Sequence, residues 1–111
     1  MIEKVIKDYL GKKLSVNVYL EYPDTLTESF VILDKTGSGR ENLISTATFA
    51  VQSYAQSKFA AAELNEYVKK AMDQLIELDE VTASKLNSDY PFPDVKRKKY
   101  RYQAVYDVTH Y

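Results

Sequence analysis

The chain lacks cysteine and tryptophan, and its 111 residues include only three glycines, three prolines and one histidine. Without cysteine there is no disulfide framework, no thiolate nucleophile and no thiolate metal site, which suits a reducing cytosol. A single histidine, His110, also leaves a catalytic triad or a histidine pair on a metal short of members. These absences exclude several common classes of enzyme site.

Long apolar runs are also missing. No stretch approaches the roughly 18 to 20 residues that cross a bilayer, and the N-terminal residues mix charges into their apolar positions as a signal peptide does not. Fifteen basic residues face sixteen acidic ones, for a net charge of −1. We therefore expect no membrane partner, and any electrostatic partner must bind a local patch.

What the chain does have is apolar content and tyrosine. Hydrophobic residues make up 45% of its 111 positions, which fits one domain covering residues 1–111. Ten tyrosines are many for this length. Because tyrosine joins a large apolar ring to a polar tip and is enriched at protein interfaces, the composition favours an assembly role.

The first third of the chain predicts one helix and two strands. Apolar residues recur every three or four positions over residues 2–10, which predicts a short helix capped by Gly11. Residues 14–23 alternate and predict a half-buried strand. The all-apolar stretch Phe30–Leu33 predicts a strand covered on both faces, and the glycine-containing residues 36–42 predict a hairpin tip.

The remaining residues predict a strand, a long helix and one or two further strands. Residues 43–55 alternate and should pair antiparallel to the preceding strand. Ser57 is a plausible N-cap for a helix over residues 58–77. Residues 81–86 are compatible with a short strand, whereas residues 100–111 carry the clearest alternation in the chain. The apolar stripe of this helix comprises Ala60, Leu64, Val68, Ala71 and Leu75, and the last four of these are predicted to face the sheet.

This order of elements predicts an α+β fold. We expect a single mainly antiparallel sheet of four or five strands, with an N-terminal helix and one long helix packed on one face. The sequence shows no internal repeat and no low-complexity segment.

Few residues suggest chemistry. His110 lies one residue from the C-terminus, where the positional precision of catalysis is hard to maintain, so we assign it a structural or incidental role. The segment Thr36–Glu41 resembles a phosphate-binding loop but lacks the Gly-Lys-Ser/Thr ending and opens no helix. No calcium-loop spacing occurs among the acidic residues. We therefore predict no catalytic, cofactor or metal site, and keep an enzyme or nuclease as a minor alternative.

The basic run at residues 96–99 is the strongest candidate for binding. Tyr100 and Tyr102 interleave with basic residues there, as stacking and phosphate-contacting groups could. One alternative is therefore a small nucleic-acid-binding module that uses Lys96–Tyr102. The other is a solvated or protein-facing loop that leads into the last strand, which the net charge of the chain favours.

Three stretches in order, "FVILDKTGSGR", "SYAQSKFAAAELNEYVKKAM" and "YRYQAVYDVTH", resemble the tail-terminator (tail completion, or minor tail) proteins of long-tailed bacteriophages. With the N-terminal helix and "VNVYLEYP", the resemblance covers nearly the whole chain. Each stretch is generic alone, and the order and spacing carry the likeness. Leu33 and Lys35 around Asp34, and the absence of a long proline-rich lead into the second strand, indicate a divergent branch.

The resemblance implies a structural protein without catalysis or cofactors. Such proteins form a ring, usually of six subunits, that caps the tail tube and meets the head connector or head-completion protein, with DNA only as passing cargo. The implied location is the tail neck of the virion, after synthesis in the cytoplasm of a bacterial host. It also implies that residues 35–42 and 86–99 are loops that order on assembly. The candidate interface residues are Tyr19, Lys35, Ser38, Arg40, Lys96, Arg97, Lys98 and Lys99.

Overall fold

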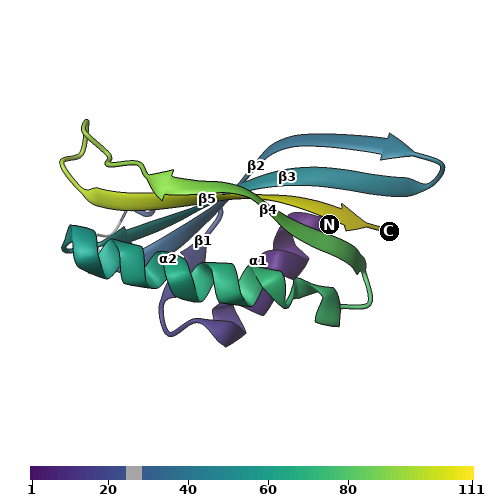
Figure 1. Ribbon diagram of the computed structural model, residues 1–111, viewed down its shortest axis with the longest axis horizontal. Coiled ribbons are helices and arrows are strands. Elements are labelled where there is room, and N and C mark those ends of the chain that lie inside the picture. Colours follow the sequence, from purple (N-terminus) through teal and green to yellow (C-terminus); the bar gives the residue numbers. More distant parts are fainter. Residues whose placement is uncertain (25–28) are drawn as a thin grey trace.

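The computed structural model describes residues 1–24 and 29–111 and is elongated, with principal extents of 43, 24 and 24 Å. Within these residues, five strands form one sheet in the order β1-β2-β3-β5-β4, and helices α1 and α2 lie on one face of it (Figure 1). The strands are β1 (Asn17–Tyr19), β2 (Phe30–Glu41), β3 (Ile44–Ala55), β4 (Val81–Pro91) and β5 (Tyr100–His110). The predicted α+β fold is confirmed.

Helix α1 (Ile2–Lys13) is longer than the sequence predicted. Its buried residues Ile6, Tyr9 and Leu10 recur at helical spacing and face the sheet. The prediction that Gly11 caps this helix is wrong, because no described glycine has a positive φ. The chain instead leaves the helix at Leu14 in an extended conformation, so Gly11 remains an ordinary helical residue.

The predicted strand over residues 14–23 is reduced to the three residues of β1. Only Val18 in β1 is buried, and β1 pairs parallel to the start of β2, at Phe30–Ile32. The other three pairings are antiparallel, so the sheet is mixed but mainly antiparallel. The alternation reflects contact with the core, since Val16 also packs against the main cluster, but the backbone pairs with β2 only at residues 17–19.

The β2–β3 hairpin is the largest departure from the sequence interpretation. Phe30–Leu33 are buried on both faces as predicted, but β2 then continues through the glycines to Glu41. Residues 36–42 are therefore mostly strand and not a loop, with a bulge between Lys35 and Gly37. The turn consists of Asn42 and Leu43, and the hairpin extends beyond both helices (Figure 1).

Helix α2 (Lys58–Asp73) begins as predicted. The Ser57 hydroxyl accepts a hydrogen bond from the Ala60 amide at 3.0 Å, which caps the first turn. The helix ends four residues early and is followed by a 3₁₀ turn, η1 (Leu75–Glu77). The predicted stripe is buried in the main core: Leu64, Val68, Ala71 and Leu75.

Strands β4 and β5 form a long hairpin. The short strand predicted at residues 81–86 extends through Pro91, with bulges beside Thr82 and Asn87. Residues 86–91 are thus paired strand, which corrects their interpretation as a loop. β5 confirms the predicted alternation, with Ala104, Tyr106 and Val108 buried toward the helices.

The sheet has apolar clusters on both faces. The larger core lies between the sheet and the helices, where the Tyr106 hydroxyl donates a hydrogen bond to Asp73 in α2 at 2.8 Å. A smaller cluster on the opposite face contains Phe30, Ile32 and Tyr54, with Tyr19 and Tyr22 packed against it. This second cluster lies close to the basic run.

Candidate interaction surfaces

Seven of the eight candidate interface residues form two groups at opposite ends of the molecule, and Tyr19 belongs to neither group. Lys35, Ser38 and Arg40 lie on β2 toward the end of the hairpin. The basic turn, residues 96–99, lies between β4 and β5 at the other end (Figure 1). Tyr19 is in β1, half-buried, with its ring edge-on to Phe30 at 5.9 Å. The structure therefore does not join these residues into one surface.

The hairpin group shares the helix-facing side of the sheet. Lys35, Ser38 and Arg40 line a hollow of about 380 Å³ between the hairpin and the start of α1, which His110 also lines. The Lys35 amine forms an ion pair with Glu3 at 3.1 Å. Among the described residues, Arg40 forms no ion pair, so its charge is available to a partner.

The two turn residues of the hairpin have left-handed backbones. Asn42 has φ 52° and Leu43 has φ 69°. A two-residue hairpin turn of this kind favours Asn followed by Gly, because both positions need positive φ. Asn42 fits that preference, whereas Leu43 keeps a side chain that is 77% exposed. A large apolar residue here is disfavoured by both backbone conformation and hydration.

The basic turn is not a uniform patch of free charges. Lys96 and Lys98 are exposed, but the Arg97 guanidinium lies 3.9 Å from the centroid of the Tyr22 ring. Arg97 also bonds to Asp94 at 3.2 Å, through both its amide and its side chain. One of the four basic residues therefore helps to hold the end of the sheet together.

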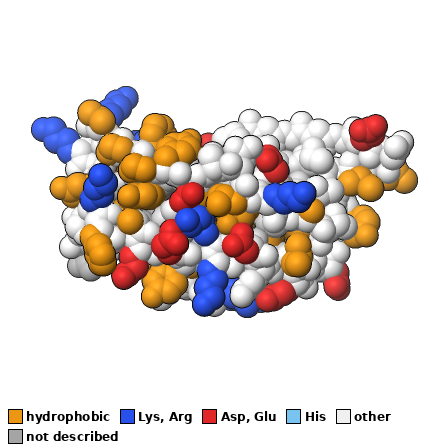
Figure 2. Space-filling view, in the orientation of Figure 1, with side chains coloured by type: hydrophobic (Ala, Val, Ile, Leu, Met, Phe, Trp, Pro, Cys, Tyr) orange, Lys and Arg blue, Asp and Glu red, His pale blue; other side chains and the backbone are white. Residues whose placement is uncertain are grey.

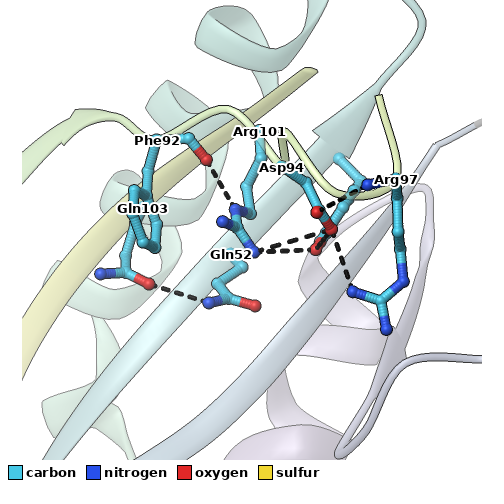
Figure 3. Close-up of polar contacts among 7 residues, drawn as sticks. Gln52, Phe92, Asp94, Arg97, Arg101 and Gln103 are labelled. Atoms are coloured by element: carbon cyan, nitrogen blue, oxygen red, sulfur yellow. Dashed lines mark hydrogen bonds and ion pairs between the residues drawn. The ribbon is translucent and has the colours of Figure 1, made fainter. Parts of the chain in front are cut away.

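Asp94 is the centre of a polar cluster at this end (Figure 3). Its carboxylate is 6% exposed and accepts a hydrogen bond from the Tyr54 hydroxyl at 2.8 Å. Arg101 donates to the Tyr54 hydroxyl at 3.0 Å and to the Phe92 carbonyl at 2.6 Å. The cluster ties the β4–β5 turn to β3 across the second apolar cluster.

The pKa values of this cluster follow from its burial. Burial alone raises the pKa of Asp94, but hydrogen bonds from Tyr54 and Arg97 outweigh it, and the pKa is lowered from 3.8. Burial, together with the bond to Asp94, raises the pKa of Tyr54 to about 12. At neutral pH the cluster is therefore an ionised carboxylate held by a neutral phenol and two guanidinium groups.

Both edges of the sheet have unpaired backbone over most of their length. β1 covers only Phe30–Ile32 of β2, so among the described strands nothing pairs with the outer side of residues 33–41. β4 is the other outer strand of the sheet, and its eleven residues pair only with β5. Such edges are templates for pairing with another strand.

Exposed apolar side chains gather at the β4–β5 end and at the hairpin turn. Figure 2 shows orange side chains concentrated at the left end, and mostly white surface along the projecting hairpin until its tip. At the β4–β5 end these include Phe92, Val95 and Tyr100, and at the tip Leu43 and Ile44. The two ends thus carry separate apolar surfaces.

Several sites considered in the sequence are not formed. Thr36–Glu41 is a strand paired with β3, so it cannot act as a phosphate-binding loop at a helix start. The described residues contain no group of three or more acidic or histidine side chains placed to hold a metal ion. In the same residues no helix is long and apolar enough to cross a membrane.

Sequence reasoning missed the Asp94 cluster, the unpaired edges of the sheet and the left-handed backbone conformation of Leu43. The cluster joins residues 40 positions apart, and no local pattern pairs Tyr54 with Asp94. A local signal did exist for the turn, since asparagine, the residue at position 42, commonly adopts the left-handed conformation.

A scan against protein-family models and a search of curated proteins find no match to this chain.

Proposed function

We propose that this chain is a structural assembly protein whose copies join head to tail into a ring. From the likeness described above, the ring caps the tail tube of a bacteriophage and forms the joint to the head. The protein acts through geometry and not through catalysis. The observation that supports self-association is the pair of free edges on one sheet, β2 at one side and β4 at the other.

The strand directions favour this assembly. β2 and β4 run in opposite directions, because each successive pairing between them through β3 and β5 is antiparallel. If neighbouring copies are related by rotation about an axis along the strands, β4 of one copy lies antiparallel to β2 of the next. Antiparallel pairing is the slightly more stable arrangement, and residues 33–41 offer enough length for it.

Such a contact suits a ring because its two sides differ. A contact between identical patches closes at two subunits, whereas a contact between different patches repeats around an axis until it closes. The β2 edge and the β4 edge are different surfaces, so each copy can bind two neighbours. The proposed ring leaves the hairpin end at one rim and the basic turn at the other, where tail tube and head protein would bind.

The test measures both assembly and capping. Native mass spectrometry over a range of concentrations gives the number of subunits, alone and with purified tail tubes that lack their cap. We expect a closed ring, either free or formed on the tube end, and tubes of fixed length. A strict monomer that neither binds tube ends nor limits tube growth would overturn the proposal.

A nucleic-acid-binding module remains the second candidate, because Lys96 and Lys98 are exposed beside the exposed ring of Tyr100. The involvement of Arg97 and Arg101 with Asp94 weakens it, since fewer cations are free for phosphate. Titration of DNA affinity against salt separates the two. A phosphate-binding patch loses affinity steeply with salt, whereas a capping protein should bind DNA weakly at physiological salt.

A further inference from the structure

The hairpin end, defined as residues 40–44, carries features that the fold itself does not require. Leu43 combines a left-handed backbone, φ 69°, with a side chain that is 77% exposed. Glycine at this position would adopt the backbone conformation without strain and would expose no apolar side chain. Backbone strain of this kind concentrates at binding and catalytic sites. Arg40 adds a cation on the helix-facing side that has no ion-pair partner among the described residues.

A second surface has the complementary chemistry. The acidic corner, residues 76–80, links η1 to the start of β4. Ile76 is 58% exposed there, and Asp79 and Glu80 are exposed acids without ion pairs in the described part of the chain. The corner is well held, since the Val81 amide donates to the Leu78 carbonyl at 3.0 Å and the Tyr111 amide to the Glu80 carbonyl at 3.0 Å.

The edge pairing described above brings these two surfaces together. With β2 of one copy antiparallel to β4 of the next, the Glu41 end of β2 lies beside the Val81 end of β4. The hairpin end of one copy then meets the acidic corner of its neighbour. Arg40 and the corner share the helix-facing side, because Arg40 lines the hollow beside α1 and η1 follows α2.

We propose that the hairpin end of each copy docks on the acidic corner of the next, with Leu43 packed on Ile76 and Arg40 facing Asp79 and Glu80. The occupant of each corner is a second copy of this chain. The hairpin end carries an exposed apolar residue and a cation, the corner carries an exposed apolar residue and two acids, and the two strand edges can pair antiparallel. The inference rests on the proposed ring and specifies which residues form its contact.

Disulfide trapping tests the contact directly, because the chain has no cysteine of its own. Two otherwise complete proteins, Leu43→Cys and Ile76→Cys, are mixed under mild oxidation over a range of concentrations. We expect a cross-linked pair in the mixture that forms far more slowly with either protein alone. The matched control replaces Ile76→Cys with Val95→Cys, an exposed apolar position at the opposite end of the molecule.

Charge reversal supplies a second measurement. Arg40→Glu should weaken association by about tenfold or more, as expected for a central interface residue. Combining Arg40→Glu with Asp79→Lys and Glu80→Lys in one chain should restore it. Lys58→Glu, a reversal of an exposed charge at the start of α2, away from the hairpin end, should leave association unchanged. Circular dichroism and melting of each variant separate lost assembly from lost folding.

The outcomes distinguish this inference from the proposed function. Cross-linking of Leu43→Cys to Ile76→Cys and rescue by the charge swap support the contact. A ring that forms normally with Arg40→Glu, or a cross-link only to Val95→Cys, overturns the contact and leaves the ring standing. If Leu43→Cys and Ile76→Cys yield no cross-link at any concentration, either alone or with purified tail tubes, the contact is overturned as well, while tube capping is judged separately.

Discussion

At the scale of single residues, the basic turn contains both exposed lysines and one arginine, Arg97, that makes contacts within the fold. The sequence predicts that replacing Lys96, Arg97, Lys98 and Lys99 by Ser leaves folding intact, because exposed charges contribute little. The structure changes this expectation for Arg97 alone. Its guanidinium lies over Tyr22 and bonds to Asp94, contacts that no spacing rule reveals because Tyr22 is 75 positions away.

Arg97→Ser should therefore lower the free energy of unfolding by about 1 to 2 kcal/mol, through the lost cation–aromatic contact and the weakened bonds to Asp94. Lys96→Ser, the neighbouring control, should change it by less than about 0.5 kcal/mol. Urea unfolding of the two variants measures the difference. Equal effects from both would show that Arg97 does not help to hold the turn.

The Asp94 cluster also predicts a pH dependence. The pKa of Asp94 is lowered from 3.8 in the folded protein, so its ionised form stabilises the fold above that value. This contribution is lost as the pH falls through the folded pKa, because the unfolded chain then binds the proton more readily. We expect Asp94→Asn to be less stable at pH 7 and to lose less further stability between pH 5 and pH 2, measured by thermal melting against pH. A melting curve as acid-sensitive as that of the unmodified protein would contradict this role.

At the scale of elements, the spacing of apolar residues predicts correctly those helices and strands that bury one face. Helix α2 and strand β5 bury one face each, and their predicted faces are correct because apolar spacing records burial directly. The hairpin was misjudged for the opposite reason. Its outer half buries little, so Gly37 and Gly39 were interpreted as a turn although both are paired with β3. A β-carbon at Gly39 would lie 3.1 Å from the Thr46 hydroxyl oxygen, so a larger residue there would require the Thr46 side chain to shift by a few tenths of an ångström.

The core-facing side of α2 gives a stringent test of the helix. Val68 is 0% exposed in the main core, so Val68→Asp places a charge where no partner lies and should cost several kcal/mol, about 3 or more. Tyr67→Asp is the matched control, because the adjacent side chain is 59% exposed. Chemical unfolding should separate the two clearly. An unchanged unfolding midpoint for Val68→Asp would mean that this face of the helix is not buried.

The strained turn makes a prediction of the opposite sign. Leu43→Gly should raise the free energy of unfolding by about 0.5 to 1 kcal/mol, since glycine relieves the left-handed strain and removes little packing. The same variant should associate more weakly if Leu43 packs on a neighbour. Thermal melting of dilute protein gives the first quantity, and sedimentation at higher concentration gives the second. A loss of stability would show that Leu43 stabilises its own chain.

At the scale of the whole molecule, the sequence indicated the architecture but not the surfaces. Local patterns specify which elements form, whereas the free edges appear only once the strand pairing is known. β5 lies between β3 and β4 and leaves β4 as an outer strand, while β1 pairs with only the first three residues of β2. The candidate interface residues were likewise divided between two ends of a molecule 43 Å long. A protein with distinct ends and two unmatched edges is suited to directional assembly, which a compact monomer with covered edges is not.

Removing the hairpin end tests this view at the same scale. Replacing residues 39–46 by Asn-Gly joins Ser38 to Ala47, which already face each other across the hairpin, through a turn that suits antiparallel strands. Within the hairpin no residue beyond Ala47 belongs to the main core, so the shortened chain should keep its fold, checked by circular dichroism and melting. It should fail to assemble and to cap tails, because the deletion removes Arg40 and Leu43 together. In a phage complementation assay we expect overlong or headless tails. Normal capping by the shortened protein would show that the hairpin end is only a connection, and that assembly uses another surface.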